Sequence, residues 1–297
     1  MISSSRPQAY LTRSKLFVPG SRPELFEKAL ASAADALSFD LEDAVLPAQK
    51  DDARRAVAAF VQNRMPTSMK TTIVRVNAVQ SPLFVADIEA LVGPGLHVLN
   101  IPKLQSAEDV RAAVSRIEDL ESKRELREPI KILANIETPA ALRLSAEIAT
   151  SSPRIVGLQI GLLDLCHACG IDPTEEVAVQ HFRITVRVAA AEAGVAAYDS
   201  AFANIKDVEG FRASAITAKR IGFSGKSCIH PSQVPVANEV FSPSTEDVRS
   251  AERIITAAAA SNAAGAFALE GQMIDAPVIA RARAILELAA TLNREPA

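Results

Sequence analysis

Three short apolar runs of this chain end in acidic side chains. The acids are Asp40, Glu42 and Asp43 after residues 36–39, Glu137 after residues 132–136, and Asp164 after residues 155–161. A carboxylate at the end of a buried strand costs stability unless it meets a cation, so the recurrence indicates a shared site. Carboxylate oxygens are the ligands of hard cations, which predicts Mg²⁺, or alternatively Mn²⁺, rather than zinc.

Basic side chains accompany the neighbouring β-like runs. Arg75 lies within residues 73–77, and Lys103 follows residues 98–102. A buried guanidinium is costly unless it meets an anion, and its planar fork matches a carboxylate. We therefore expect Arg75 to hold a substrate carboxylate. A divalent ion beside it would stabilise the enolate charge that develops when a C–C bond next to a keto acid is cleaved or formed.

Each of these residues also has a structural interpretation, which the sequence leaves open. The acids after residue 39 could be surface or helix-capping acids, Glu137 could serve only the helix that starts after Thr138, and Arg75 could form an internal ion pair. Cys166 and Cys169 have the spacing of a redox or zinc motif. No second pair of ligands lies nearby in the sequence, which favours ordinary thiols.

The composition excludes several classes of protein. The net charge is −3 and no basic block occurs, so nucleic acid is not expected as a partner. No apolar run reaches the roughly 20 residues of a membrane span, so no membrane association is expected. The chain has 3 cysteines, which argues against a disulfide framework and indicates a cytoplasmic location.

The 297 residues suffice for one large barrel, and β-like runs alternate with helical segments along them. The expected strands are Lys15–Val18, Ala36–Asp40, Thr72–Asn77, Val98–Pro102, Lys131–Ile136, Ile155–Ile160, Ala196–Asp199 and Ser227–Ile229. The helices expected between them are Pro23–Ala33, Lys50–Gln62, Pro82–Val92, Ala107–Leu120, Pro139–Ala149, Glu176–Ala193 and Val208–Arg220. Strict alternation of this kind predicts an α/β protein with a (β/α)₈ TIM barrel.

The pattern changes after residue 230. A helix is expected over residues 247–263, a short hairpin or turn over 265–271 and a last helix over 277–292. We therefore expect two domains, a catalytic barrel in residues 1–230 and a C-terminal helical extension in residues 231–297.

The chain resembles the citrate lyase β-subunit family of the HpcH/HpaI aldolase superfamily. The matching segments occur in order along nearly the whole chain: residues 13–20, 40–45, 74–77, 102–103, 136–138, 161–165, 225–233 and 273–275. The resemblance implies a Mg²⁺-dependent C–C lyase. Such an enzyme splits a citramalyl-, malyl- or citryl-CoA type of 3-hydroxyacyl thioester into an acyl-CoA and a 2-keto acid, or runs the reverse reaction.

The resemblance also implies roles for individual residues. Glu137 and Asp164 would bind the metal, Glu42 and Asp43 would orient its waters, and Asp275 would transfer a proton. Arg75, Lys103, Gly161 and Leu163 would bind the substrate, and Arg13 and Lys15 would meet the phosphates of coenzyme A or of a carrier. The extension would cover the active site of a neighbouring subunit, which implies a homo-oligomer, often a trimer.

Two departures from the family pattern concern substrate preference. Leu163 and Gln105 stand where relatives often carry acids. Three other functions remain alternatives: the β subunit of a multi-subunit citrate lyase acting on a carrier-bound thioester, a malyl-CoA-type thioesterase, and a non-catalytic binding protein on the same fold.

Overall fold

Eight parallel strands close into a barrel in the order of the sequence, which confirms the predicted TIM barrel. The structure, a computed structural model, describes residues 12–261 and 265–294. The strands are β1 (Ser14–Pro19), β2 (Ala36–Asp40), β3 (Thr71–Arg75), β4 (Val98–Ile101), β5 (Lys131–Ile136), β6 (Ile155–Ile160), β7 (Ala196–Asp199) and β8 (Gly225–Cys228). Every strand begins and ends within a few residues of the expected position, because fully buried strands read as short apolar runs.

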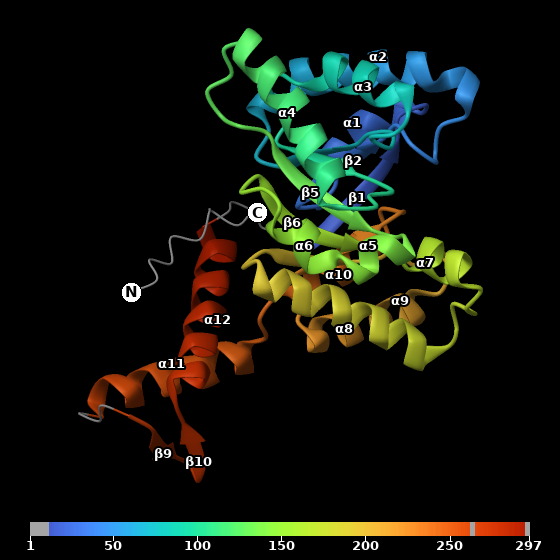
Figure 1. Ribbon diagram of the computed structural model, residues 1–297. Coiled ribbons are helices and arrows are strands. Elements are labelled where there is room, and N and C mark those ends of the chain that lie inside the picture. The colour runs from blue at the N-terminus through green and yellow to red at the C-terminus, as the bar shows by residue number, and fades with distance from the viewer. Residues whose placement is uncertain (1–11, 262–264, 295–297) are drawn as a thin grey trace. The chain divides into compact units, whose positions relative to one another are not determined.

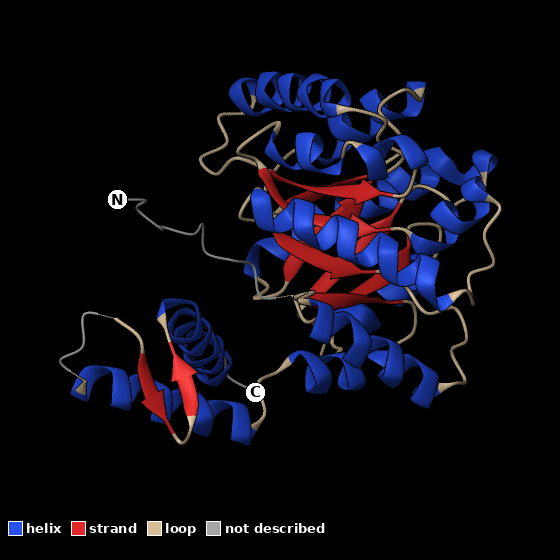
Figure 2. Ribbon diagram, turned by 60° about the horizontal axis from the view of Figure 1, so that its bottom comes forward, coloured by secondary structure: helices blue, strands red, loops and turns tan. Residues whose placement is uncertain are grey.

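Helices surround the barrel, as Figures 1 and 2 show. They are α1 (Phe26–Leu30), α2 (Lys50–Arg64), α3 (Pro82–Leu91), α4 (Ala107–Lys123), α5 (Pro139–Arg143), α6 (Ser145–Thr150), α7 (Leu162–Cys169), α8 (Glu176–Glu192), α9 (Val208–Ile221) and α10 (Gln233–Phe241). The expected caps form: Ser81 and Thr138 accept backbone hydrogen bonds at the starts of α3 and α5, and Ser106 begins α4 with a capping box.

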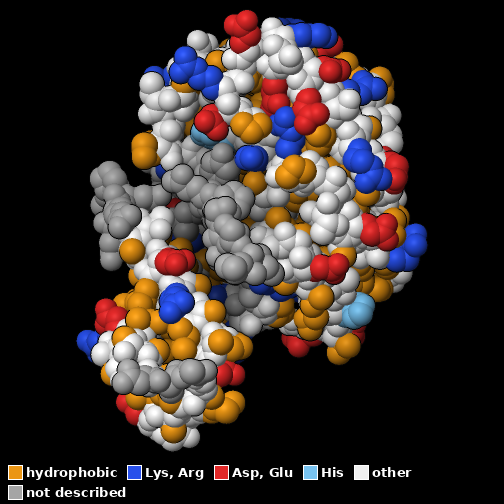
Figure 3. Space-filling model, turned by 60° about the vertical axis from the view of Figure 1, so that its left-hand side comes forward, with side chains coloured by type: hydrophobic (Ala, Val, Ile, Leu, Met, Phe, Trp, Pro, Cys, Tyr) orange, Lys and Arg blue, Asp and Glu red, His pale blue; other side chains and the backbone are white. Residues whose placement is uncertain are grey.

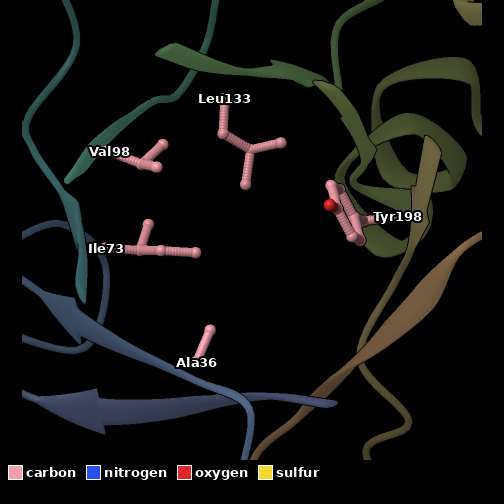
Figure 4. Packing of buried hydrophobic residues seen from close by; sticks show 5 residues of the cluster. All are labelled: Ala36, Ile73, Val98, Leu133 and Tyr198. Carbon is pink, nitrogen blue, oxygen red and sulfur yellow. The ribbon is translucent and has the colours of Figure 1, made fainter. Parts of the chain in front are cut away.

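The interior of the barrel contains an apolar cluster. Ala36, Ile73, Val98, Leu133 and Tyr198 come from five different strands and point toward one another inside the barrel (Figure 4). All five side chains are buried; Ala36 and Val98 are the first residues of their strands, and the other three are each the third. The polar residues of the candidate site follow at the opposite ends of the strands, as expected for a TIM barrel.

Helix α7 is an element that the sequence analysis did not predict, because no helix was expected over residues 162–169. The helix follows Gly161 directly and ends at Gly170, whose φ of 66° lies in the left-handed region that favours glycine. The helix has 8 residues, and only Leu165 and Cys166 are buried. Two buried positions do not produce a recognisable helical period in the sequence. Asp164 therefore lies in a first helical turn rather than in a loop.

The described chain divides into two compact units, Met1–Asn238 and Glu239–Ala297, so the division lies inside α10 rather than at residue 230. The first part of α10 belongs to the barrel. Asn238 accepts a hydrogen bond of 2.6 Å from Ser14 Oγ and donates one of 2.7 Å to the carbonyl oxygen of Ala33. These contacts extend the barrel unit beyond its last strand.

The second unit contains two long helices and a hairpin. Helices α11 (Thr245–Ala260) and α12 (Ala276–Arg294) pack against each other. Between them β9 (Phe267–Leu269) pairs antiparallel with β10 (Gln272–Ile274), so the expected hairpin is present. Residue 263, the expected end of the first helix, lies outside the described residues. Within the described ranges no helix is long and apolar enough to cross a membrane.

Candidate active site

Glu137 directly follows β5 and is the buried acid of the site. Its side chain accepts a hydrogen bond of 2.7 Å from the backbone N–H of Lys103 and one of 3.1 Å from Asn135 Nδ2. Only 4% of Glu137 is exposed. Burial raises the pKa of its carboxyl group to about 7, against the effects of the Lys103 N–H and of Arg75. Because burial disfavours the ionised form of this carboxyl group, a bound cation would stabilise it.

Asp164 reaches the same region from the next strand. It is exposed in the first turn of α7, and its charge contributes to the raised pKa of Glu137. Gly161 makes this approach feasible, because a Cβ atom at that position would lie 2.8 Å from Glu137 Oε2. The two predicted metal ligands therefore lie near enough for the charge of Asp164 to act on Glu137, although they are far apart in the sequence.

The donor set fits a hard cation that keeps water or substrate ligands. Glu137 and Asp164 offer only carboxylate oxygens. Within residues 12–261 and 265–294, no three His, Cys, Asp or Glu side chains gather as a metal cluster, at this site or at any other. Mg²⁺ is often held by one or two carboxylates and several waters, whereas structural zinc takes four protein ligands. Cys166 and Cys169 are free thiols, the first buried and the second exposed.

Arg75 pairs with Asp40, as the structural interpretation of the sequence proposed. Its Nε lies 2.8 Å from Oδ1 of Asp40 and its Nη2 lies 2.5 Å from Oδ2. Nη1 is also 3.2 Å from Glu42. These acids raise the already high pKa of Arg75 despite its burial. The guanidinium is therefore a permanent positive charge. Its edge formed by Nε and Nη2 is already hydrogen-bonded to Asp40.

Glu42 and Asp43 are joined to Lys103. The Lys103 ammonium contacts Glu42 and lies 3.0 Å from Asp43 Oδ1. Burial raises the pKa of Glu42, whereas the hydrogen bond from Lys103 overcomes partial burial and lowers the pKa of Asp43. The two acids that follow β2 are therefore held toward the residue that follows β4.

A chain of polar contacts supports the loop after β2, and the sequence analysis gave its members no role. Lys50 donates to the carbonyl oxygens of Leu41 and Glu42, at 2.7 and 2.6 Å, and to Asn77 Oδ1 at 2.9 Å. Asn77 in turn donates through Nδ2 to the buried Asp87, at 2.6 Å. Neither a lysine at the first position of a helix nor an amide just after a strand carries a signal of such contacts in the sequence.

Arg13 and Lys15 do not lie where a coenzyme A phosphate would be expected. Arg13 comes before β1, at the end opposite the site, and its guanidinium pairs with Asp35 at 2.7 and 2.9 Å. Lys15 is only 1% exposed, and burial lowers its pKa well below the usual value. Because a phosphate cannot reach a lysine inside the barrel, this placement disagrees with the expected role.

Phe17 is a residue of the site that the sequence analysis missed. The centre of its ring lies 4.7 Å from Lys15 Nζ and 5.2 Å from the guanidinium carbon of Arg75. An aromatic face stabilises cations at such distances. The only signal in the sequence is the alternation within β1, which turns residues 15 and 17 to the same side.

Two other predicted site residues are less constrained. Leu163 is 50% exposed beside Asp164. Asp275 belongs to the second unit, where its backbone carbonyl accepts a hydrogen bond from the Ile279 N–H at the start of α12. On the face shown in Figure 3, acidic and basic side chains are interspersed rather than gathered by sign.

The catalytic residues of TIM-barrel enzymes lie at the carboxyl ends of the strands. In this chain the acids and bases after β2 to β6 gather there, which is the arrangement of a metal-assisted barrel enzyme.

Comparison with known proteins identifies the family to which the chain belongs. It belongs to the HpcH/HpaI aldolase/citrate lyase family, whose model matches residues 13–231. It is 37% identical to the citrate lyase subunit beta of Haemophilus influenzae over 96% of this chain and 99% of that protein. It is 34% identical to an L-malyl-CoA/beta-methylmalyl-CoA lyase of Cereibacter sphaeroides, with 97% of both chains covered.

The solved structures agree with the family. The CitE protein of Mycobacterium tuberculosis, in complex with magnesium, acetoacetate and coenzyme A, has a TM-score of 0.77 to this chain at 35% identity. The likeness covers 93% of this chain and 97% of that one. The family and the barrel fold expected from the sequence are therefore confirmed.

Proposed function

We propose that this protein is a Mg²⁺-dependent C–C lyase acting on a 3-hydroxyacyl-CoA thioester. It would release an acyl-CoA and a 2-keto acid, or condense them in reverse. The observation that carries the proposal is the buried Glu137 carboxylate, which lies against Gly161 at the start of the helix that carries Asp164, within reach of the charges of Asp164 and Arg75. The relatives named as citrate lyase subunit beta and malyl-CoA lyase support the reaction class, and the CitE complex with magnesium and coenzyme A supports the ligands.

Glu137 and Asp164 would hold the ion, and Mn²⁺ could replace Mg²⁺ because both are hard cations. When bound, the ion supplies positive charge that stabilises negative charge developing on the keto-acid oxygen. Glu42 and Asp43 would orient water at the ion, and the contacts of both acids with Lys103 support this role. The buried Glu137 is held by two hydrogen bonds before any ligand arrives, so little reorganisation is needed.

Arg75 would bind the keto-acid carboxylate. A guanidinium has five N–H donors; the Asp40 pair uses two of them, and Nη1 also lies 3.2 Å from Glu42. Asp40 thus fixes the orientation of the side chain while other donors remain for the substrate. Arg75 is largely buried, which strengthens its interaction with a carboxylate relative to water. Gly161 and Leu163 border the same region and would contact the substrate.

Asp275 would transfer the proton, with residues 231–297 serving as an extension over the active site of a neighbouring subunit. Asp275 lies where the hairpin of the second unit meets α12, so a compact unit presents it. This arrangement requires a homo-oligomer, which we propose to be a trimer. We also retain the cytoplasmic location predicted from the cysteine content.

A direct assay tests the proposed function. The purified chain is incubated with Mg²⁺ and citramalyl-, malyl- or citryl-CoA, and the 2-keto acid is measured together with the acyl-CoA. Keto acid formation that stops with EDTA is the expected result. Release of free coenzyme A and intact hydroxy acid would show a thioesterase instead, and no turnover of any thioester would support a binding protein.

Action as a citrate lyase β subunit is a second candidate, because the identity to such subunits extends over 96% of this chain. The same assay separates the two candidates when the substrate is presented once as a free CoA thioester and once on an acyl carrier protein. Turnover only on the carrier would favour the subunit.

A further inference from the structure

Lys103 has a backbone conformation that a lysine rarely adopts. Its φ is 52°, in the left-handed region where a Cβ atom meets steric repulsion. Among the described residues, only Glu125 and Glu270 share a positive φ without being glycine. An ammonium group on a flexible side chain can reach a substrate from ordinary backbone geometry, so substrate binding does not explain this conformation.

In this conformation the backbone and the side chain of Lys103 contact acids that follow different strands. The backbone N–H donates to Glu137 Oε1 at 2.7 Å, and the ammonium lies 3.0 Å from Asp43 Oδ1 and also contacts Glu42. The buried Glu137 receives one further hydrogen bond, from Asn135. The Lys103 N–H is thus one of two groups that fix the orientation of the carboxylate.

We propose that Lys103 is a positioning residue for the metal ligand Glu137 and acts through its left-handed backbone. This inference rests on the proposed function, because it assigns Glu137 to the metal. The N–H orients the Glu137 carboxylate that would hold the ion, while the side chain balances the charge of the acids after β2. Glycine would adopt the backbone more easily but would lose the ammonium, so lysine combines both tasks at one position.

A substitution series separates the backbone from the side chain. Lys103→Gly, Lys103→Ala and Lys103→Val all remove the ammonium. They differ in access to a positive φ, which is easy for glycine, harder for alanine and hardest for a β-branched residue. The Mg²⁺ dissociation constant is measured by calorimetry on each metal-free protein without substrate, and circular dichroism and thermal unfolding confirm the fold.

We expect the Mg²⁺ dissociation constant to rise from Gly through Ala to Val by about three- to tenfold in total. If Lys103 acts only through its ammonium, the three variants bind Mg²⁺ equally within twofold, and the proposal is overturned. The Gly variant relieves the backbone, so it keeps the series interpretable even where Val folds poorly.

Glu125 provides a matched control, because it has the same φ of 52° but is exposed between α4 and β5, at the other end of the barrel. The same three substitutions there should change thermal stability in the same order and leave Mg²⁺ affinity unchanged. A parallel change in Mg²⁺ affinity at Glu125 would show a general effect of folding and count against the proposal. If Glu137→Gln leaves Mg²⁺ affinity intact, the proposed metal site itself fails.

Discussion

Asp40 and Arg75 are register partners on the adjacent strands β2 and β3, and their side chains form a two-point ion pair. Only 2% of the Asp40 side chain and 15% of the Arg75 side chain is exposed. Because a buried charge without a partner is costly, each residue depends on the other. The pair is both a structural element of the barrel and the support of the proposed carboxylate site.

The first prediction concerns stability. Asp40→Ala should lower the free energy of unfolding by about 3–5 kcal/mol, since it removes the two-point partner of a buried guanidinium and leaves Arg75 only its longer contact with Glu42. Urea denaturation measures the loss. Asp52→Ala is the control, because Asp52 and Arg55 form an exposed pair whose removal should cost less than about 1 kcal/mol. Equal losses at both positions would contradict the importance of the buried pair.

The second prediction concerns the proposed carboxylate site. Arg75→Ala should weaken binding of the keto-acid product by about 2–5 kcal/mol, because it removes a desolvated partner of the carboxylate. Calorimetric titration with pyruvate, glyoxylate or oxaloacetate measures this. Arg54 forms a buried ion pair with Asp87. Arg54→Ala is therefore the control for the general destabilisation that follows from the loss of a paired arginine. Unchanged product affinity in Arg75→Ala would remove Arg75 from the binding site.

The third prediction concerns the metal ligands. Glu137→Gln and Asp164→Asn should abolish Mg²⁺-dependent turnover and leave the fold intact, because both changes keep the size of the side chain and remove its charge. Turnover and Mg²⁺ titration are measured beside circular dichroism. Asp172→Asn, an exposed acid after α7, should have no effect on either quantity. A wild-type rate in either ligand variant would refute the metal assignment.

The fourth prediction concerns pH. The pKa of Glu137 rises from 4.5 to about 7 on folding without metal, so the folded protein retains a proton that the unfolded chain loses. This group therefore lowers stability as pH rises from about 4.5 to 7, by about 3 kcal/mol at 1.36 kcal/mol per pKa unit. Mg²⁺ affinity should increase across pH 7, since binding must release that proton.

Urea unfolding in EDTA at several pH values measures the effect, and calorimetry at the same pH values measures Mg²⁺ affinity. In Glu137→Gln this part of the pH dependence should disappear, because the amide does not titrate. An identical pH profile in the variant and the wild type would show that another group is responsible.

The fifth prediction concerns Asp275 and the oligomer. Asp275→Asn should reduce kcat more than it changes substrate binding, because a proton-transfer group acts mainly in the transition state. If Asp275 serves a neighbouring subunit, mixing Asp275→Asn with Arg75→Ala protein under exchange conditions should restore part of the activity. Size-exclusion chromatography with light scattering establishes the oligomeric state. Loss of binding with an unchanged kcat would indicate a structural role for Asp275.

The sequence by itself determined the barrel fold and the acidic residues at the carboxyl ends of its strands. Runs such as residues 132–136 are apolar throughout because parallel strands are buried on both faces, and that pattern is local. The position of Glu137 directly after such a run also follows from the sequence, since the end of a strand faces the active site of a barrel.

Only the tertiary structure decided which groups meet. Asp40 rather than Glu42 takes the fork of Arg75, because the register of β2 and β3 places them side by side. Lys15 lies inside the barrel, although the family resemblance had implied a phosphate contact for it. Pairings of this kind depend on register, strand tilt and burial, which arise only when distant segments pack together, and no local pattern of residue types encodes them.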